Sequence, residues 1–225
     1  MNLENPYEPE LGSLPEQTDA AGREQTTETG TTSVGLTTED GVVLATDRRA
    51  SLGGRVVSNK NVQKVEQIHD TAALTMVGSV GGAQSYIRSI RAEANLYEAR
   101  RGESMSVNAL ATIASNFARG GPFMMINPVL GGVDDSGPHV YSIDPLGGLS
   151  EDDYVVTGSG MQYALGVLEQ EYREDLTLED GVTIGAKAVQ SASERDTSSG
   201  NGITIAEITE EGVEIHTHDD VEELL

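Results

Sequence analysis

The chain has 225 residues, with 37 aspartates and glutamates against 14 lysines and arginines, and its formal net charge is −23. Acids spread over the whole chain leave no basic footprint for nucleic-acid binding, and no apolar run approaches the ~20 residues of a membrane span. The absence of cysteine excludes disulfides, thiolate metal sites and a cysteine nucleophile, and it fits an intracellular protein.

The first 30 residues differ in composition from the rest of the chain. Their apolar residues are too few and too scattered to bury a face, so the segment is predicted to be largely disordered. It lacks the basic and apolar regions of a secretory signal. We interpret residues 1–30 as an acidic pro-segment, with an ordinary N-terminal tail as the alternative. It carries one base, Arg23, and the acids Glu4, Glu8, Glu10, Glu16, Asp19, Glu24 and Glu28.

The junction between Gly30 and Thr31 lies where this segment meets the first strand-like run. Cleavage there would make Thr31 the N-terminal residue and give it both a hydroxyl nucleophile and a free α-amine. The amine can serve as the base that activates the hydroxyl. The boundary therefore suggests a cleavage site at Gly30-Thr31 and a hydrolase centred on Thr31, although most threonines in such a stretch are strand or turn residues.

Strand-like runs occur in three blocks along the chain. Runs 32–38 and 41–47 meet at Glu39-Asp40-Gly41, where Asp-Gly is a hairpin signal. Asp135-Ser136-Gly137 supplies a later turn. The other predicted strands are 55–58, 71–77, 124–134, 139–144, 154–157, 203–208 and 213–217.

Two pairs of helices are predicted between the strand blocks. Residues 79–101 and 106–119 place apolar residues at spacings of three and four. The second pair covers about 160–173 and 178–195, where Thr177 to Asp180 resembles a capping box. The order predicts an α+β fold, with two packed sheets between outer helix pairs: a four-layer αββα sandwich.

Several motifs occur in a meaningful order, although each alone is weak. They are Gly30-Thr31-Thr32-Ser33-Val34-Gly35, Ala45-Thr46-Asp47-Arg48-Arg49-Ala50, Val62-Gln63-Lys64-Val65, Met76-Val77-Gly78, Thr157-Gly158-Ser159-Gly160 and Arg195-Asp196-Thr197-Ser198-Ser199-Gly200. Together they resemble the archaeal proteasome β subunits over essentially all of 31–217. That family has the αββα fold of the N-terminal-nucleophile hydrolases. The resemblance implies a pro-segment at 1–30, a catalytic domain at 31–217 and an acidic C-terminal tail at 218–225.

The resemblance implies a catalytic group around Thr31, which matches the family's nucleophile. Lys64 matches its catalytic lysine, provided that the 52–60 turn holds one extra residue; without that shift the position falls on Gln63. Asp47 matches the acid that pairs with the lysine, whereas in isolation it could form a surface pair with a neighbouring arginine.

Further residues match the rest of the family's site. Ser159, Asp196 and Ser199 match the group around the threonine α-amine. Gly78 matches the oxyanion-hole glycine, and Met76 matches the base of the pocket for the residue before the scissile bond, where it favours apolar side chains. Ser51 and Gly78 would line the path of an extended peptide.

The resemblance also implies a function and partners. It predicts a threonine endopeptidase, cytoplasmic and without cofactor, that cleaves itself and then degrades unfolded polypeptides. Partners would be α subunits, other β subunits in heptameric rings of a four-ring barrel, and indirectly a regulatory ATPase ring. A non-catalytic ring subunit, another N-terminal-nucleophile amidohydrolase and the simpler bacterial two-ring protease are the alternatives.

Other patterns point to weaker hypotheses. His216 and His218 could reach one ion on a strand face, but nothing else supports a metal site, so none is predicted. Gly158-x-Gly160 and the Gly78–Gly82 run lack the remaining residues of a dinucleotide or phosphate loop. The acidic excess indicates adaptation to high salt, because molar salt shortens the Debye length to about 3 Å. An ordinary acidic protein is the alternative.

Overall fold

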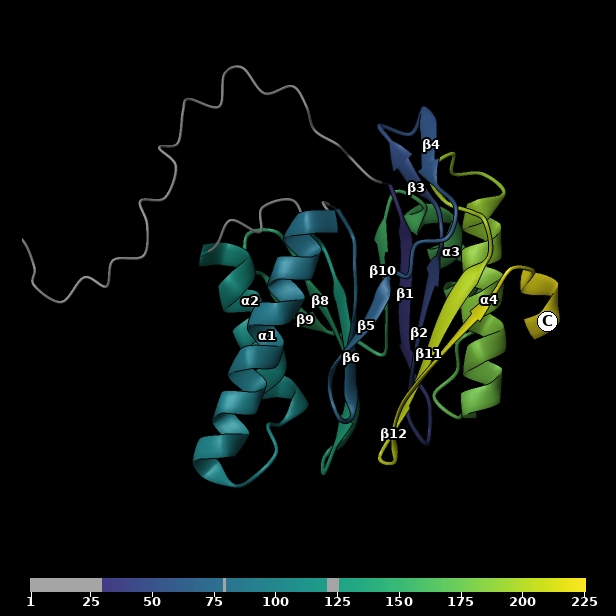
Figure 1. Cartoon of the computed structure of the whole chain (residues 1–225). Coiled ribbons are helices and arrows are strands. Elements are labelled where there is room, and N and C mark those ends of the chain that lie inside the picture. The colour runs from purple at the N-terminus through teal and green to yellow at the C-terminus, as the bar shows by residue number, and fades with distance from the viewer. Residues whose placement is uncertain (1–29, 79, 121–125) are drawn as a thin grey trace, which may run out of the picture.

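The structure is a computed structural model that describes residues 30–78, 80–120 and 126–225. Two five-stranded antiparallel sheets form its centre, beside a separate two-stranded hairpin. The first sheet has the order β10-β1-β2-β11-β12 and the second has the order β5-β6-β7-β8-β9. The two sheets lie face to face (Figure 1).

The first sheet joins strands from both ends of the chain. Its central strands β1 and β2 are buried along almost their whole length, as expected of strands covered on both faces. The β1–β2 hairpin predicted at Asp40-Gly41 is confirmed, with Thr37 opposite Val42. The strands are β1 (Thr32–Thr37), β2 (Val42–Asp47), β10 (Tyr154–Gly158), β11 (Ile203–Thr209) and β12 (Gly212–His218).

The second sheet is built from the middle of the chain. Its strands are β5 (Val65–His69), β6 (Ala72–Thr75), β7 (Val129–Asp134), β8 (Gly137–Ile143) and β9 (Leu149–Glu151). Valines from β2, β7 and β8, together with Leu44 of β2, meet between the two sheets and form a common core. This core fixes the spacing between the sheets, because buried apolar side chains pack at close to crystalline density.

Each sheet carries a pair of helices on its outer face (Figure 1). Helices α1 (Val80–Arg101) and α2 (Val107–Gly120) pack on the second sheet around Tyr86, Ile90 and Leu110. Helices α3 (Met161–Glu171) and α4 (Leu178–Ser193) pack on the first sheet around Leu168 and Ile184. All four predicted helices are confirmed, and the Thr177 side chain accepts a hydrogen bond from the Asp180 N–H, as the predicted cap requires. None of the described helices is long and apolar enough to cross a membrane.

The sequence prediction differs from the structure at several short elements. The strand predicted over 124–134 begins only at Val129, because Pro128 interrupts the ladder and Ile126 makes an isolated bridge to Gly78; residues 124 and 125 lie outside the described residues. Three-residue strands such as β9 are too short for periodicity to reveal.

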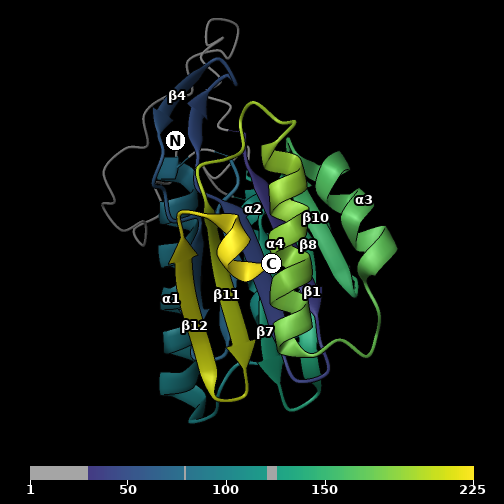
Figure 2. The same ribbon diagram turned by 90° about the vertical axis from the view of Figure 1, so that its right-hand side faces the viewer.

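A hairpin that stands above the end of the first sheet was only half predicted. It consists of β3 (Ala50–Leu52) and β4 (Val56–Asn59), and it rises clear of the two sheets (Figure 2). The turn between its strands contains Gly53 and Gly54, both at positive φ. This hairpin occupies the stretch where the sequence required one extra residue, so it sets the position of Lys64.

The end of the chain is more ordered than a solvated acidic tail. Residues Val221–Leu224 form a short 3-10 helix, η2, beside α4 (Figure 2). Val221 and Leu224 pack against the core under α4, and the Thr183 hydroxyl donates to the Leu224 carbonyl at 3.2 Å. Asp219, Asp220, Glu222 and Glu223 remain exposed. The apolar residues between the acids therefore anchor the tail.

Candidate active site

Thr31, Asp47 and Lys64 meet at one end of the molecule, between the two sheets. Thr31 directly precedes β1 and Asp47 ends β2, so the antiparallel pairing of these strands brings both residues to the same edge. Lys64 comes from the other sheet, directly before β5. Lys64 Nζ lies 2.8 Å from Thr31 Oγ1 and 2.8 Å from Asp47 Oδ1. All three residues are buried.

The Asp47 carboxylate is fully satisfied. Oδ1 accepts from the Thr32 N–H at 3.0 Å in addition to Lys64. Oδ2 accepts from the Arg49 N–H at 2.9 Å and the Gly200 N–H at 3.0 Å. A buried carboxylate with hydrogen-bond donors on both oxygens holds its neighbours in place. Asp47 therefore fixes the position of Lys64 and is not the surface residue that its arginine neighbours suggested.

Burial controls the protonation of Lys64. Removal from water lowers the pKa of its amine below the ordinary lysine value, and the Asp47 carboxylate opposes that shift. The neutral amine is therefore easier to reach than in a solvated lysine, and it lies within hydrogen-bonding distance of the Thr31 hydroxyl. Gln63 turns away from the site, because its side-chain amide donates to the Val65 carbonyl at 3.0 Å. The structure thus places Lys64, and not Gln63, beside Thr31.

A second polar group gathers on the other side of Thr31. Ser159 Oγ and Ser199 Oγ each donate to Asp196 Oδ2 at 2.6 Å, and Ser159 Oγ lies 3.5 Å from the Thr31 carbonyl oxygen. The Ser199 hydroxyl already donates its single proton to Asp196. In the 2.8 Å contact between Ser199 Oγ and Thr32 Oγ1, Thr32 is therefore the donor. The three residues predicted around the α-amine are therefore connected to one another and to the start of β1.

Close backbone approaches explain two glycines at the site. Gly158 lies opposite Thr32 at φ +98°, where any Cβ would meet the Thr31 carbonyl. A Cβ on Gly30 would lie 2.0 Å from Ser198 Cβ and 2.7 Å from Ser159 Oγ. Ser198 and Ser159 therefore leave no space for a side chain on the residue before Thr31.

A small cavity adjoins the Thr31 hydroxyl. Its volume is about 20 Å³, close to that of one water molecule. Gly78 lies beside it, between β6 and α1, at φ +103°, a conformation that favours glycine. The cavity is lined by Thr31, Arg49, Ala50, Val62, Lys64, Met76, Gly78 and Ala83. Met76 and Gly78 therefore lie where the sequence placed them, next to the nucleophile.

Ser51 lies on β3, close to the same cavity wall as Ala50. Ser51 is buried, and its hydroxyl has no hydrogen-bond partner among the described residues. Within the described part of the chain, β3 pairs only with β4. The second edge of β3 is thus without a strand partner, which is the arrangement that an added peptide strand would use.

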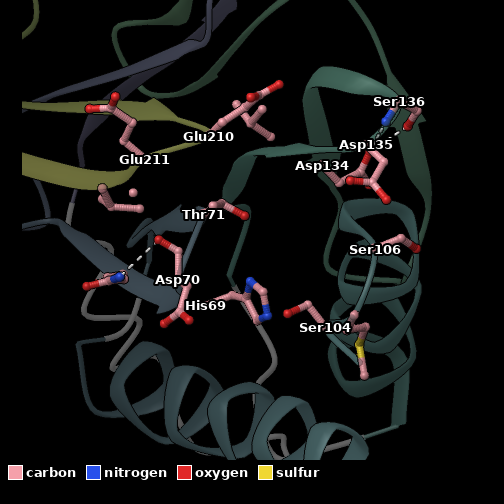
Figure 3. Close-up of a pocket in the computed structure, with 15 residues that line it drawn as sticks. His69, Asp70, Thr71, Ser104, Ser106, Asp134, Asp135, Ser136, Glu210 and Glu211 are labelled. Carbon is pink, nitrogen blue, oxygen red and sulfur yellow. Dashed lines mark hydrogen bonds between the residues drawn. The ribbon is translucent and has the colours of Figure 1, made fainter. Parts of the chain in front are cut away.

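A large groove lies at the opposite end of the sheets. It has a volume of about 1050 Å³. Asp70, Asp134 and Glu210, from the β5–β6, β7–β8 and β11–β12 turn regions, surround it (Figure 3). It does not include Thr31, Asp47 or Lys64. Among the described residues, no group of three His, Asp or Glu side chains could hold a metal ion.

A serine–histidine contact beside this groove has the geometry of a hydrolase pair. Ser136 Oγ lies 2.8 Å from His139 Nε2, and His139 Nδ1 lies 2.6 Å from Glu151 Oε1. However, Ser136 Oγ also donates to Asp134 Oδ1 at 2.5 Å. Its proton is therefore directed at a carboxylate, and His139 is left to donate to Ser136 instead of acting as its base. The Thr31 group is the better candidate.

Comparison with known proteins identifies the family. The family model described as "Proteasome subunit" matches residues 27–208. The chain belongs to the proteasome subunit family. It is similar to proteins named "Proteasome subunit beta" from three haloarchaea. The identities are 67% for Natrialba magadii (98% of this chain and 91% of the relative), 66% for Halorhabdus utahensis (98% and 94%) and 63% for Natronomonas pharaonis (98% and 93%).

The similarity extends over nearly the whole proteasome subunit. At this identity the chain is a proteasome core subunit of the β type, as its motifs suggested. The relatives come from halophilic archaea, in agreement with the acidic composition. Family membership implies a threonine protease and assembly with α subunits. The family alone does not separate catalytic from non-catalytic members, so the geometry around Thr31 has to support that distinction.

Sequence reasoning missed several residues of the site. Thr32 and Ser198 contact the predicted residues, and the Arg49 guanidinium joins the loop that carries Asp196. Thr32 and Ser198 each adjoin a predicted residue in the sequence, which is the one signal that could have revealed them. For Arg49, the sequence offered no indication of where its side chain would lie.

Proposed function

We propose that this chain is a catalytic β subunit, a threonine-type endopeptidase, folded as the four-layer αββα sandwich of the N-terminal-nucleophile hydrolases. The observation that carries the proposal is the position of Lys64 Nζ, 2.8 Å from both Thr31 Oγ1 and Asp47 Oδ1 in a buried site. A non-catalytic ring subunit would have no need for a satisfied buried lysine beside a threonine hydroxyl, because burying a charge without a role is costly.

In peptide hydrolysis, Thr31 Oγ attacks the scissile carbonyl. Its proton passes to Lys64 or to the α-amine, and the new C–O bond forms an acyl-enzyme as the C–N bond breaks and the leaving amine takes a proton. The Gly78 N–H stabilises the oxyanion. Water then hydrolyses the ester and restores the Thr31 hydroxyl. Asp47 keeps Lys64 in place throughout, and Asp196 with the two serines orients the amine.

The same nucleophile performs maturation. In the full chain Thr31 has no free amine, so Thr31 Oγ attacks the carbonyl of Gly30 with Lys64 as the proton acceptor. The Gly30–Thr31 C–N bond breaks as Lys64 returns the proton to the Thr31 nitrogen, and an ester between Gly30 and Thr31 Oγ remains. Water then hydrolyses this ester and releases residues 1–30 with a new carboxylate on Gly30. Ser198 and Ser159 pack against Gly30 so closely that a side chain there would displace the residue before the scissile bond.

The partners follow from the family and are proposed as such. We place the subunit in the cytoplasm, in heptameric β rings between rings of α subunits, where a regulatory ATPase ring supplies unfolded polypeptides. Residues 1–30 act as the pro-segment, 31–217 as the catalytic domain and 218–225 as the C-terminal tail.

Substituting Thr31 tests both activities. Thr31→Ala should leave assembled particles that show no peptidase activity, and its β subunit should keep the mass of the full chain, because the nucleophile for both reactions is gone. Intact mass spectrometry and fluorogenic peptide assays at molar salt measure the two outcomes. Peptidase activity in Thr31→Ala, or an active wild-type subunit that still begins at Met1, would refute the proposal.

A matched change on the other side of the scissile bond separates processing from turnover. Gly30→Val should slow self-cleavage, because its side chain would clash with Ser198 and Ser159. Once cleaved, however, the enzyme would be identical to wild type and should have the same kcat per mature site. A non-catalytic subunit, or an amidohydrolase inactive on peptides, would fail the wild-type peptide assay.

Cleavage specificity is expected to depend on Met76. The cavity beside Thr31 is about 20 Å³ and admits a large apolar side chain only if the flexible Met76 side chain moves aside. The wild type should cleave after Tyr or Leu faster than after Lys or Arg, and Met76→Gly should change the ratio of kcat/KM among apolar residues. Competition between fluorogenic peptides measures this ratio, and faster wild-type cleavage after Lys or Arg would contradict the assignment.

A further inference from the structure

The loop that carries Asp196 and Ser199 has an unusual backbone. Between α4 and β11 it passes through Gly200, Asn201 and Gly202 at φ +143°, +66° and +92°. Asn201 is the one non-glycine with positive φ among the described residues. Asparagine tolerates this left-handed conformation better than most residues, yet a run of three such positions has little local preference of its own. Contacts from elsewhere in the fold must hold it.

Arg49 supplies those contacts. Its Nε donates to Asn201 Oδ1 at 2.9 Å and its Nη1 donates to the Thr197 carbonyl at 3.0 Å. The guanidinium also lies against Gly200, where a Cβ would be 2.5 Å from Nη2. One rigid planar group thus spans the loop from Thr197 to Asn201. A lysine could not reproduce this, because its single ammonium lacks the fork of N–H donors.

Arg49 also joins the two halves of the site. Its backbone N–H donates to Asp47 Oδ2, the same oxygen that accepts from the Gly200 N–H. Asp47 is the residue that holds Lys64, and the clamped loop carries the carboxylate that receives both serine hydroxyls. The position of Arg49 therefore fixes the Lys64 side and the Asp196 side relative to each other.

The positive charge of Arg49 gives this residue a second, electrostatic influence on the site. Both acceptors of its side chain are neutral oxygens, so these contacts leave its positive charge uncompensated. This charge is among the smaller influences that lower the pKa of Lys64. A variant that keeps the positive charge but loses the fork of N–H donors is needed to separate the positioning effect of Arg49 from its electrostatic effect.

We propose that Arg49 is a positioning residue for the hydrolysis reaction: its guanidinium clamps the loop between Thr197 and Asn201, whose last two residues have positive φ, and thereby holds Asp196 and Ser199 beside Thr31. The inference rests on the proposed function. Without the clamp, the Asp196 carboxylate moves away from the α-amine of the processed Thr31. An ammonium loses a stabilising anion in that case, so the pKa of the amine falls.

The test compares Arg49→Lys, Asn201→Gly and the double variant with the wild type in assembled particles at molar salt. Arg49→Lys keeps the charge but loses the fork, and Asn201→Gly keeps the left-handed backbone but loses the acceptor. Each should lower kcat by about 100-fold, the scale of a 1 Å misplacement, with little change in KM. The acid limb of the kcat–pH profile should move to lower pH. The double variant should be about as impaired as either single variant, because both remove one clamp.

Arg48→Lys is the matched control, because Arg48 is adjacent in sequence but directs its side chain to the exposed Asp219. It should behave as wild type. A kcat for Arg49→Lys within twofold of wild type would overturn the clamp, as would an equal loss at every pH without a shift of the acid limb, or an equal loss in Arg48→Lys. If Arg49→Lys fails to assemble, Asn201→Gly decides by the same criteria. Activity that survives Thr31→Ala would overturn the proposed function instead.

Discussion

Lys64→Ala should reduce peptidase activity on the order of a thousand-fold or more, whereas Gln63→Ala should leave it nearly unchanged. Thousand-fold is the scale of removing a principal electrostatic or proton-transfer element. Lys64 Nζ is within hydrogen-bonding distance of the Thr31 hydroxyl, and burial lowers the pKa of its amine toward the range where it can accept a proton. The Gln63 side-chain amide instead donates to the Val65 carbonyl at 3.0 Å. Fluorogenic peptide hydrolysis by purified particles measures both.

Loss of activity through misfolding needs its own control. Lys64→Ala leaves the Asp47 carboxylate buried with three backbone donors and no cation, and this costs stability. Lys64→Arg keeps a cation for Asp47, but a guanidinium cannot give up its proton. It should therefore assemble normally by size exclusion and still fail to process its own pro-segment. If Gln63 proved critical and Lys64 dispensable, the alignment that places one extra residue in the 52–60 turn would be wrong.

The helices could be predicted from periodicity, because each has an apolar face. The main strands could be predicted from short apolar or β-rich runs bounded by turn residues, even where, as in β1 and β2, both faces are buried. The position of Lys64 beside Thr31 could not be predicted in this way. It depends on a hairpin whose strands β3 and β4 have a bulge between Ala50 and Ser51, and nothing in local sequence fixes how many residues such a hairpin consumes. Only the contact between Lys64 and Thr31 decides between positions 63 and 64.

The hydrogen-bond partners that hold the site residues in place were predicted only in part, because they come from distant parts of the sequence. Asp47, Asp196 and the serines stand in recognisable motifs, but their partners are backbone N–H groups and an arginine fork. Arg49 reaches Asn201 across 152 positions of sequence, and the N–H of Gly200 reaches Asp47 across 153. Backbone donors have no side-chain signature, so the sequence identifies the charged residues and leaves out what holds them.

The assembled particle is expected to require molar salt. The chain carries a net charge of −23. The proposed processing would remove a segment with seven acids and one base, so most of the excess would remain in the mature subunit. Many such subunits would lie side by side in a ring. Their mutual repulsion acts over about 10 Å at 0.1 M salt and over about 3 Å at 1 M. In dilute buffer each subunit contact is therefore opposed by like charges on both sides.

Dialysis into low salt should dissociate the particle before its subunits unfold. Association between subunits depends on their concentration and is opposed by the repulsion between like charges. Within one subunit, by contrast, three apolar clusters between and outside the sheets do not depend on charge. Sedimentation velocity across a salt series should show the particle giving way to subunits, while circular dichroism of the same samples stays constant over that step. A particle that remains intact and active at ~50 mM salt, where the Debye length is longer than at 0.1 M, would show that the acidic surface imposes no salt requirement on assembly.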